Sequence, residues 1–302
     1  MARNWFGEGL VLLVLLAGCD GTDGAARPKG VVADAAALDS VVIKMTEFTV
    51  PAGQEIYKCQ NFSNPFGTQV DIDRFESHMP EGSHHMIVFF MDGADAGVTN
   101  GPLEDCSGSE FHPNVFGAQT PDSVIDLPSG IGVTIPATTS LRYQLHFINT
   151  STADEVAGVT TTFHIAKSGS ITSHAGQLLF SNEDISIPPN GTAQVTKTCS
   201  APTPISLLGV SAHVHRHAVD FVATTDGTQL YETKSWTDAT PVRFNPPFAL
   251  PANQGVTFTC SYVNDTAVAV TFGQSALTDE MCILGGIYYP VTDVTSPNIV
   301  CF

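Results

Sequence analysis

Five histidines and one methionine are the residues of this chain best suited to metal chemistry. They form an adjacent pair, a single histidine, a His-x-His pair and a later methionine: His84, His85, His146, His213, His215 and Met281. Three imidazoles bind Cu(I) or Cu(II), whereas two imidazoles and a thioether form a softer site that favours Cu(I), the state that reacts with O₂. We therefore expect two separate copper sites and redox chemistry on oxygen.

The spacing within each pair indicates how its backbone must run. On a strand, His213 and His215 lie on one face, because side chains alternate with period two, and they form a natural chelate. His217 continues this face and is either a support for a ligand, a competing ligand or a solvated histidine. A regular strand would send His84 and His85 to opposite faces, so the chain there must be irregular, at a bulge or a strand end.

The elements that carry these residues are predicted to be strands. Short apolar runs rich in β-branched and aromatic residues alternate with turn residues, and the chain contains 26 Gly and 19 Pro. No segment has a sustained helical period. This pattern favours an all-β protein. Four of these runs contain candidate ligands or directly follow them: 86–91, 141–148, 207–215 and 282–289.

A chain of 302 residues is long enough for two ordinary domains. The small polar stretch at 167–170 suits a linker. We therefore expect an N-terminal copper domain over residues 40–168 and a C-terminal copper domain over 169–302. The first three histidines then fall in one domain, and the His-x-His pair and Met281 fall in the other.

The N-terminus is typical of an export signal. An apolar run ends in Leu16-Ala17-Gly18-Cys19, which is similar to the lipobox of bacterial lipoproteins. Residues 1–19 would be the signal peptide, Cys19 the lipidated residue and residues 20–39 a flexible tether. The alternatives are an ordinary signal peptide or a short membrane anchor. We expect an exported lipoprotein on the periplasmic face of a membrane or at the cell surface, in contact with the membrane only through this anchor.

Charge and cysteine content narrow the class further. The 12 Lys and Arg against 30 Asp and Glu give a net charge of −18, which opposes binding to nucleic acid. Without Cys19 six cysteines remain, an even number that suits an oxidising compartment and a set of disulfides. The sequence alone permits about 15 pairings of six cysteines.

The ordered set of motifs resembles the copper type II, ascorbate-dependent monooxygenases, the family of peptidylglycine α-hydroxylating monooxygenase and dopamine β-monooxygenase. The matching segments are the His-His-Met motif at residues 84–86, Gln144-Leu-His146, the His-x-His pair and Asp279-Glu-Met-Cys282. The resemblance covers roughly residue 40 to the C-terminus. It implies two antiparallel β-sandwich domains of jelly-roll type, side by side, with one copper on each wall of a cleft.

The resemblance also assigns roles. His84, His85 and His146 would hold an electron-transfer copper, and the His-x-His pair with Met281 would hold the catalytic copper. Gln144 would orient groups between the two sites, or it simply faces water. The implied disulfides are Cys59–Cys106, Cys199–Cys301 and Cys260–Cys282.

Three positions depart from the peptide-amidating members of the family. Those members grip a terminal carboxylate with Arg, Asn and Tyr, where this chain has Ser211, Ile283 and Gly285. Without the Arg, a buried carboxylate would lack its bidentate partner. Peptide amidation is therefore disfavoured, and a more apolar, less charged substrate is expected. The alternative is a cationic amine, which would suit the acidic surface.

The expected function is hydroxylation of a C–H bond in a small molecule, in a monomer that uses two copper ions, O₂ and an external reductant such as ascorbate. The first alternative is a copper-binding or copper-carrying lipoprotein without turnover, because ligand resemblance does not guarantee activity. The second is a β-sandwich adhesion module that binds no stoichiometric metal.

Overall fold

The computed structural model describes residues 39–91, 100–108, 110, 112–237 and 239–302. These residues form strands, turns and loops and no helix, so none of them forms a helix that could cross a bilayer. The predicted signal peptide with Cys19, and all of the predicted tether except residue 39, lie outside the described residues.

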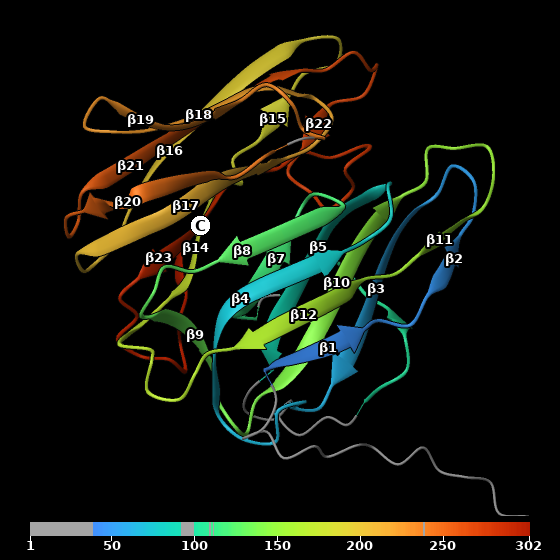
Figure 1. The fold of residues 1–302 in the computed structure, drawn as a ribbon. Coiled ribbons are helices and arrows are strands. Elements are labelled where there is room, and N and C mark those ends of the chain that lie inside the picture. The colour runs from blue at the N-terminus through green and yellow to red at the C-terminus, as the bar shows by residue number, and fades with distance from the viewer. Residues whose placement is uncertain (1–38, 92–99, 109, 111, 238) are drawn as a thin grey trace, which may run out of the picture. The chain divides into compact units, whose positions relative to one another are not determined.

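The first sandwich is built from residues 40–174 and has two main sheets, which Figure 1 shows one in front of the other. The order in the first sheet is β1 (Ser40–Lys44), β12 (Thr160–Ile165), β4 (Val70–His78), β9 (Ile131–Ile135) and β13 (Ser173–His174), with β8 (Asp122–Asp126) also paired to β4. The order in the second is β6 (Glu104–Asp105), β3 (Glu55–Phe62), β10 (Ser140–Ile148), β5 (Ser83–Met91) and β7 (Asn114–Ala118). A small ribbon pairs β2 (Phe48–Val50) with β11 (Glu155–Ala157).

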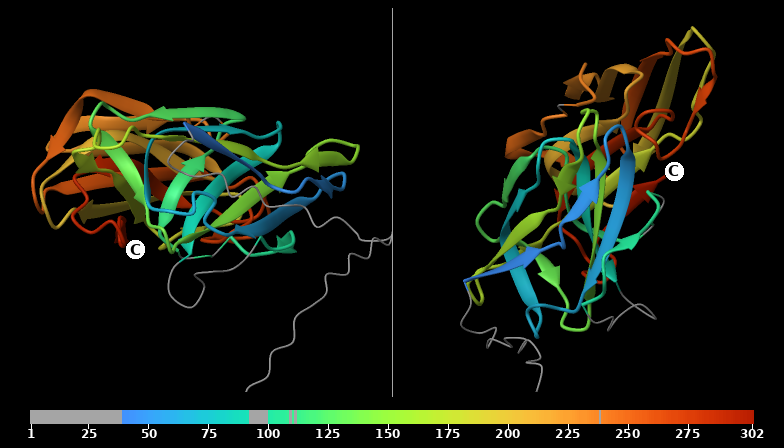
Figure 2. Two further views of the ribbon diagram at one scale, coloured as in Figure 1. Left: turned by 60° about the horizontal axis from the view of Figure 1, so that its bottom comes forward. Right: turned by 90° about the vertical axis from the view of Figure 1, so that its right-hand side faces the viewer.

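The second sandwich is built from residues 176–301 in the same manner (Figure 2). One sheet has the order β20 (Val242–Leu250), β17 (Ile205–Val214), β23 (Cys282–Tyr289), β14 (Gly176–Ser181) and β24 (Ile299–Cys301). The other has the order β16 (Thr192–Ser200), β21 (Gly255–Val263), β18 (Ala218–Thr225) and β19 (Thr228–Thr233). A small ribbon pairs β15 (Ser186–Ile187) with β22 (Val270–Thr271).

The predicted fold class is confirmed: the described chain is all-β, with jelly-roll sandwiches in which the chain crosses repeatedly between facing sheets, as from β3 to β4 to β5. Nearly all pairings are antiparallel, and the parallel ones are β9 with β13 and β14 with β24. Each sandwich has its own buried core. Along the chain, the buried residues of the first core give way to those of the second between Ala175 and Leu178. Leu208 of the second sandwich belongs to the first core, which shows that the two pack together. Separate folding of the predicted domains, 40–168 and 169–302, stays a prediction.

Within the described part of the chain three disulfides are present, with the pairing that the family resemblance implies. They are Cys59–Cys106, Cys199–Cys301 and Cys260–Cys282. The last of these joins β21 to the first residue of β23, directly after Met281. It therefore fixes the strand start that presents the candidate thioether ligand.

Candidate metal centre

A bulge in β5 brings the two adjacent histidines to the same region. On the neighbouring strand β10, His146 is opposite His85 and Phe147 is opposite Ser83, so His84 is the extra residue of the bulge. Both His84 and His85 are buried, at 8% and 7% exposure. The predicted backbone irregularity is therefore confirmed, and it places three imidazoles at one end of the sheet.

Strands β17 and β23 place the second ligand set. Their antiparallel register pairs His213 with Ile283 and Val214 with Cys282. Continuing the register by one residue puts His215 beside Met281, on the same face as His213, because side chains alternate along a strand. His215 and Met281 are buried, at 0% and 6% exposure.

All five histidine rings meet in one cluster. The ring centroid of His84 lies 5.0 Å from that of His146, 4.9 Å from that of His213 and 5.3 Å from that of His215. The rings of His85 and His213 are 5.0 Å apart. The packing of the sandwiches therefore brings histidines of both predicted sets into contact. The division of these histidines between two copper sites stays a prediction.

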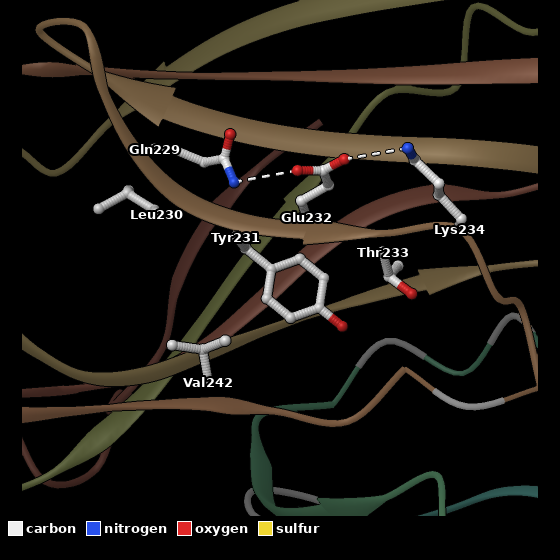
Figure 3. Close-up of a pocket in the computed structure, with 7 residues that line it drawn as sticks. All are labelled: Gln229, Leu230, Tyr231, Glu232, Thr233, Lys234 and Val242. Atoms are coloured by element: carbon white, nitrogen blue, oxygen red, sulfur yellow. Dashed lines mark hydrogen bonds and ion pairs between the residues drawn. The ribbon is translucent and has the colours of Figure 1, made fainter.

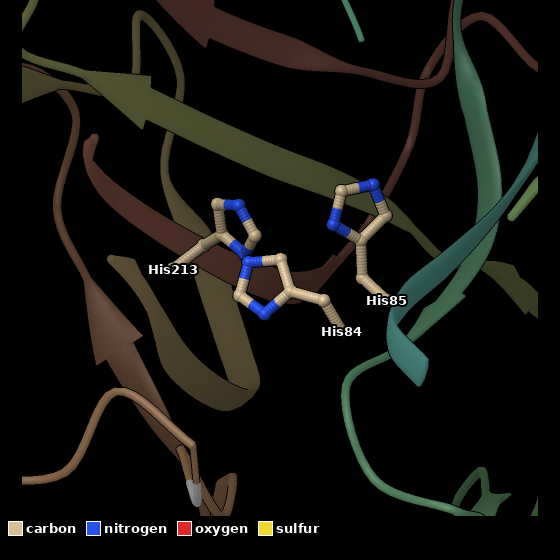
Figure 4. A group of neighbouring side chains, drawn as sticks. All are labelled: His84, His85 and His213. Carbon is tan, nitrogen blue, oxygen red and sulfur yellow. The ribbon is translucent and has the colours of Figure 1, made fainter. Parts of the chain in front are cut away.

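One triad crosses between the two predicted sets. His84, His85 and His213 each offer a ring nitrogen, and these nitrogens lie within 4.8 Å of one another. Figure 4 shows the three rings turned toward a common space. A metal ion can therefore be held by ligands from both sandwiches.

Four of the five imidazoles use one ring nitrogen to donate a hydrogen bond to a protein oxygen. The donor and acceptor pairs are His85 Nε2 to Gln144 Oε1 (3.3 Å), His146 Nε2 to Glu55 Oε1 (2.7 Å), His213 Nδ1 to Gln119 Oε1 (2.6 Å) and His215 Nδ1 to the Asp279 carbonyl (3.2 Å). These partners fix the tautomer and leave the other nitrogen with a free lone pair, which is the arrangement of metal-binding histidines.

Three of these free nitrogens, and one nitrogen of His84, are buried without a hydrogen-bond partner. Buried atoms without a hydrogen bond include His84 Nε2, His85 Nδ1, His146 Nδ1 and His215 Nε2. Buried polar atoms are nearly always paired, so four unpartnered nitrogens in one cluster need an explanation. A bound metal explains all four, and all-nitrogen donors beside a thioether fit copper. The residues present therefore fit the copper that the sequence predicts.

Burial keeps these imidazoles neutral. It lowers the pKa of His84, His85 and His213 well below the usual value, and it lowers the pKa of His215 to about 4. Burial also lowers the pKa of His146, although the Glu55 carboxylate opposes this effect. Since only the neutral imidazole can bind a metal, the cluster is ready for metal at pH 7.

Glu55 connects His146 to the loop that leads to Met281. Its Oε1 accepts hydrogen bonds from His146 Nε2 and from the Ala276 backbone N–H (2.6 Å), and its Oε2 accepts one from Ser275 Oγ (2.5 Å). Tyr57 strengthens the same junction: its ring stacks on His146 at 3.8 Å and its hydroxyl donates to the Gln274 carbonyl. One carboxylate thus ties both ligand sets together.

Glu280 binds the backbone of the segments that carry the second ligand set. It is fully buried and accepts backbone N–H bonds from His215 (3.1 Å), His217 (2.6 Å) and Met281 (3.3 Å). Burial raises its pKa to about 7, although these bonds act in the opposite direction. A single side chain therefore holds the backbone at both the His-x-His pair and the methionine.

Two further residues singled out in the sequence, Gln144 and His217, lie in different surroundings. Gln144 is buried, so it does not face water, and its amide spans from His85 to the Ser107 carbonyl. His217 lies after the end of β17, is buried, and has its Nδ1 4.0 Å from the Asp265 carboxylate. His217 is therefore not a solvated histidine.

A cleft of about 720 Å³ opens beside the cluster, and its walls include His85, Gln144, His213 and Met281. Another hollow, of about 540 Å³, lies along β19 (Figure 3). The hollow on β19 holds the ion pair of Glu232 with Lys234 and no histidine. The cleft is thus the space in which the histidines can meet a small molecule.

No protein-family profile and no curated protein matches this chain. Among solved structures, it is similar to the major capsid protein P2 of bacteriophage PM2, with 8% identity over 82% of this chain and 97% of that chain and a TM-score of 0.35. It is also similar to the PBSX exported protein XepA, with 8% identity over 85% and 88% of the two chains and a TM-score of 0.23. A cupin barrel protein from Leptotrichia buccalis has 9% identity over 82% and 88% and a TM-score of 0.17. At scores this low, these likenesses do not bear on the chemistry of the site.

Proposed function

We propose that this chain is a copper-dependent monooxygenase that hydroxylates a C–H bond of a small molecule. The observation that carries the proposal is the cluster of five neutral imidazoles, in which four rings donate a hydrogen bond to a protein oxygen and four buried ring nitrogens, on His84, His85, His146 and His215, have no hydrogen-bond partner. An adhesion module would have no reason to bury so many unsatisfied nitrogens in one place.

Two copper ions would be held by the five histidines and Met281. The His84, His85 and His146 imidazoles supply an all-nitrogen donor set, and Met281 adds a soft thioether to His213 and His215. When bound, copper supplies one-electron redox chemistry with O₂ that can oxidise a C–H bond. Glu55, Gln119 and Gln144 hold the imidazoles in the tautomer that binds a metal.

The overall reaction balances with an external reductant. One atom of O₂ is inserted into the substrate C–H bond to give an alcohol, and the other leaves as water. The reductant, such as ascorbate, supplies two electrons, and two protons complete the water molecule. His84, His85, His146 and His215 are buried, which limits the access of bulk water to the reacting groups.

The test is oxygen consumption by the copper-loaded protein with ascorbate, on a panel of neutral aromatics, phenethylamines and glycine-extended peptides. We expect one hydroxylated product for each O₂ consumed, and no product from His213→Ala, which removes a ligand of the set with Met281 and a member of the crossing triad. His164→Ala is the matched control, because His164 on β12 pairs with Glu76 and does not line the cleft.

The rival function is a copper carrier. The crossing triad of His84, His85 and His213 could hold one ion without turnover, so the rival rests on a specific feature of the site. A chain that binds copper and exchanges electrons with ascorbate, but gives no product with any member of the panel, would support the carrier and contradict the monooxygenase.

A further inference from the structure

We propose that the cleft beside the histidine cluster binds a neutral, apolar small molecule, and that Gly285 and Ser211 set the size it accepts. The inference rests on the proposed function, since it names the substrate class of the same site. The evidence for it is the pairing of residues between neighbouring strands that form the cleft.

The floor of the cleft is one face of the sheet that contains β17, β23 and β14. The register places its side chains in rows, because directly paired residues share a face. In the first row His213 pairs with Ile283, and Ile283 pairs with Ser181. In the second row Ser211 pairs with Gly285, and Gly285 pairs with Leu179. All of these residues line the cleft.

The second row lies one step away from the histidines. Two residues along a strand span about 7 Å. A molecule that rests on Gly285 and Ser211 can therefore present one of its atoms to the space beside His213. In the third row Gly209 pairs with Ile287, and Ile287 extends the apolar floor farther from the cluster.

The opposite wall is also lined by apolar side chains beyond its histidine. It is formed by strands β5, β7 and β10, where Ile87 pairs with both Gly117 and Gln144. Ile87 and Phe89 follow His85 at two-residue steps and line the cleft. Each wall thus runs from a histidine to apolar side chains and has a glycine one step from the cluster.

The two glycines leave room for a ligand. A Cβ atom added at Gly285 would meet only the Ser211 backbone oxygen and hydroxyl, both at 3.8 Å. One added at Gly117 would meet only the Met86 carbonyl, at 3.5 Å. Both are ordinary contacts, so neither glycine is required by the packing of the backbone. Their effect is to keep the cleft wide next to the histidines.

The charges that line the cleft argue against an ionic ligand. Among the described residues that line the cleft, Arg243 is the one lysine or arginine. Its backbone pairs with Gly209 of the third row, and its guanidinium donates a hydrogen bond to the Val124 carbonyl. No guanidinium or ammonium therefore stands in the first two rows to bind a carboxylate.

The carboxylates of the cleft are mostly occupied. Asp126 pairs with Arg74, and Glu110 pairs with Arg142. Asp122 lies 2.7 Å from His78, and Glu183 is exposed. A cationic amine would find no buried free carboxylate among these residues, so a neutral molecule fits the cleft best.

The first experiment measures binding to the metal-free protein by calorimetry, with three probes of similar size: ethylbenzene, phenethylammonium and phenylacetate. We expect ethylbenzene to bind at least about tenfold more tightly than either ion, because a site without a partner charge cannot offset the desolvation of an ion. Equal or tighter binding of either ion, or no binding of ethylbenzene, would overturn the proposal.

The second experiment fills the cleft at Gly285. Gly285→Phe and Gly285→Val place side chains above the second row, and we expect each to weaken ethylbenzene binding by at least about tenfold. Gly285→Ala adds only a methyl group and should weaken it less. Val219→Phe adds an aromatic ring at an exposed site of β18 and is the control. Thermal melts identify a variant that has lost its fold, and unchanged binding in a folded Gly285→Phe or Gly285→Val protein would overturn the proposal.

The two proposals can fail separately. Probe binding to the metal-free protein reports on the cleft whether or not oxygen is activated. Copper-dependent product formation reports on the function whichever probe is the substrate. If only an ionic probe were hydroxylated, the result would support the proposed monooxygenase activity and contradict the proposal of a neutral substrate.

Discussion

Replacing Glu55 tests whether one carboxylate ties the two ligand sets together. Glu55 accepts three hydrogen bonds, one from His146 and two from the loop before Met281. Glu55→Ala removes all three. The His146 ring would then lose the acceptor that fixes its tautomer, and the Ala276 N–H would lose its partner.

The size of the effect follows from these contacts. A hydrogen bond to a charged group contributes about 1.5–3 kcal/mol. The three bonds share one carboxylate whose side chain is 14% exposed, so water replaces part of the loss. We expect Glu55→Ala to lower the free energy of unfolding of the metal-free protein by about 3 kcal/mol. Glu55→Gln, which keeps one acceptor oxygen, should lose about half as much.

Urea unfolding measures this loss, with Glu81→Ala as the control because Glu81 is an exposed glutamate of the same sandwich. Proton–nitrogen correlation spectra of the histidine rings give a second readout. The wild type should carry the His146 proton on Nε2, and Glu55→Ala should lose this preference. A Glu55→Ala protein as stable as Glu81→Ala, with an unchanged His146 tautomer, would refute the account of Glu55.

Three further predictions concern the cluster itself. Met281→Ile should abolish hydroxylation while the three-histidine set keeps its copper; product formation by this variant and its copper content check the result. Glu280→Gln should destabilise the chain by about 2–4 kcal/mol in urea, because an amide NH₂ would face the backbone N–H groups of His215, His217 and Met281; an exposed glutamate changed in the same way should cost little. The buried imidazoles have lowered pKa values, so the unfolded chain binds more protons than the folded chain as pH falls below 6.5. The metal-free protein should therefore lose stability between pH 6.5 and about 4, and His215→Asn should lessen that loss.

Much of the local structure could be predicted from the sequence. The apolar alternation at 141–148 corresponds to β10 (Ser140–Ile148), and the run at 282–289 corresponds to β23 (Cys282–Tyr289). The bulge at His84 followed from the adjacency of two histidines, which a regular strand cannot place on one face. These features depend on short stretches of chain, where side-chain periodicity decides the outcome.

The long-range contacts could not be predicted in this way. Glu55 and His146 are 91 residues apart, and Gln119 and His213 are 94 residues apart. Neither glutamate nor glutamine at such a position carries a local signal, because its role is created by the packing of distant strands. The meeting of His84 with His213 has the same origin, which explains why contact between histidines of the two predicted sets was not expected. Glu280 alone had a visible clue, its position directly before Met281.

X-ray absorption of the copper-loaded, reduced protein tests the central claim most directly, because it identifies the atoms that bind the metal. The account predicts two copper ions per chain, bound mainly by imidazole nitrogen, with a sulfur neighbour that disappears in Met281→Ile. Copper below one ion per chain, or a spectrum without sulfur in the wild type, would contradict a copper centre built from the five histidines and Met281.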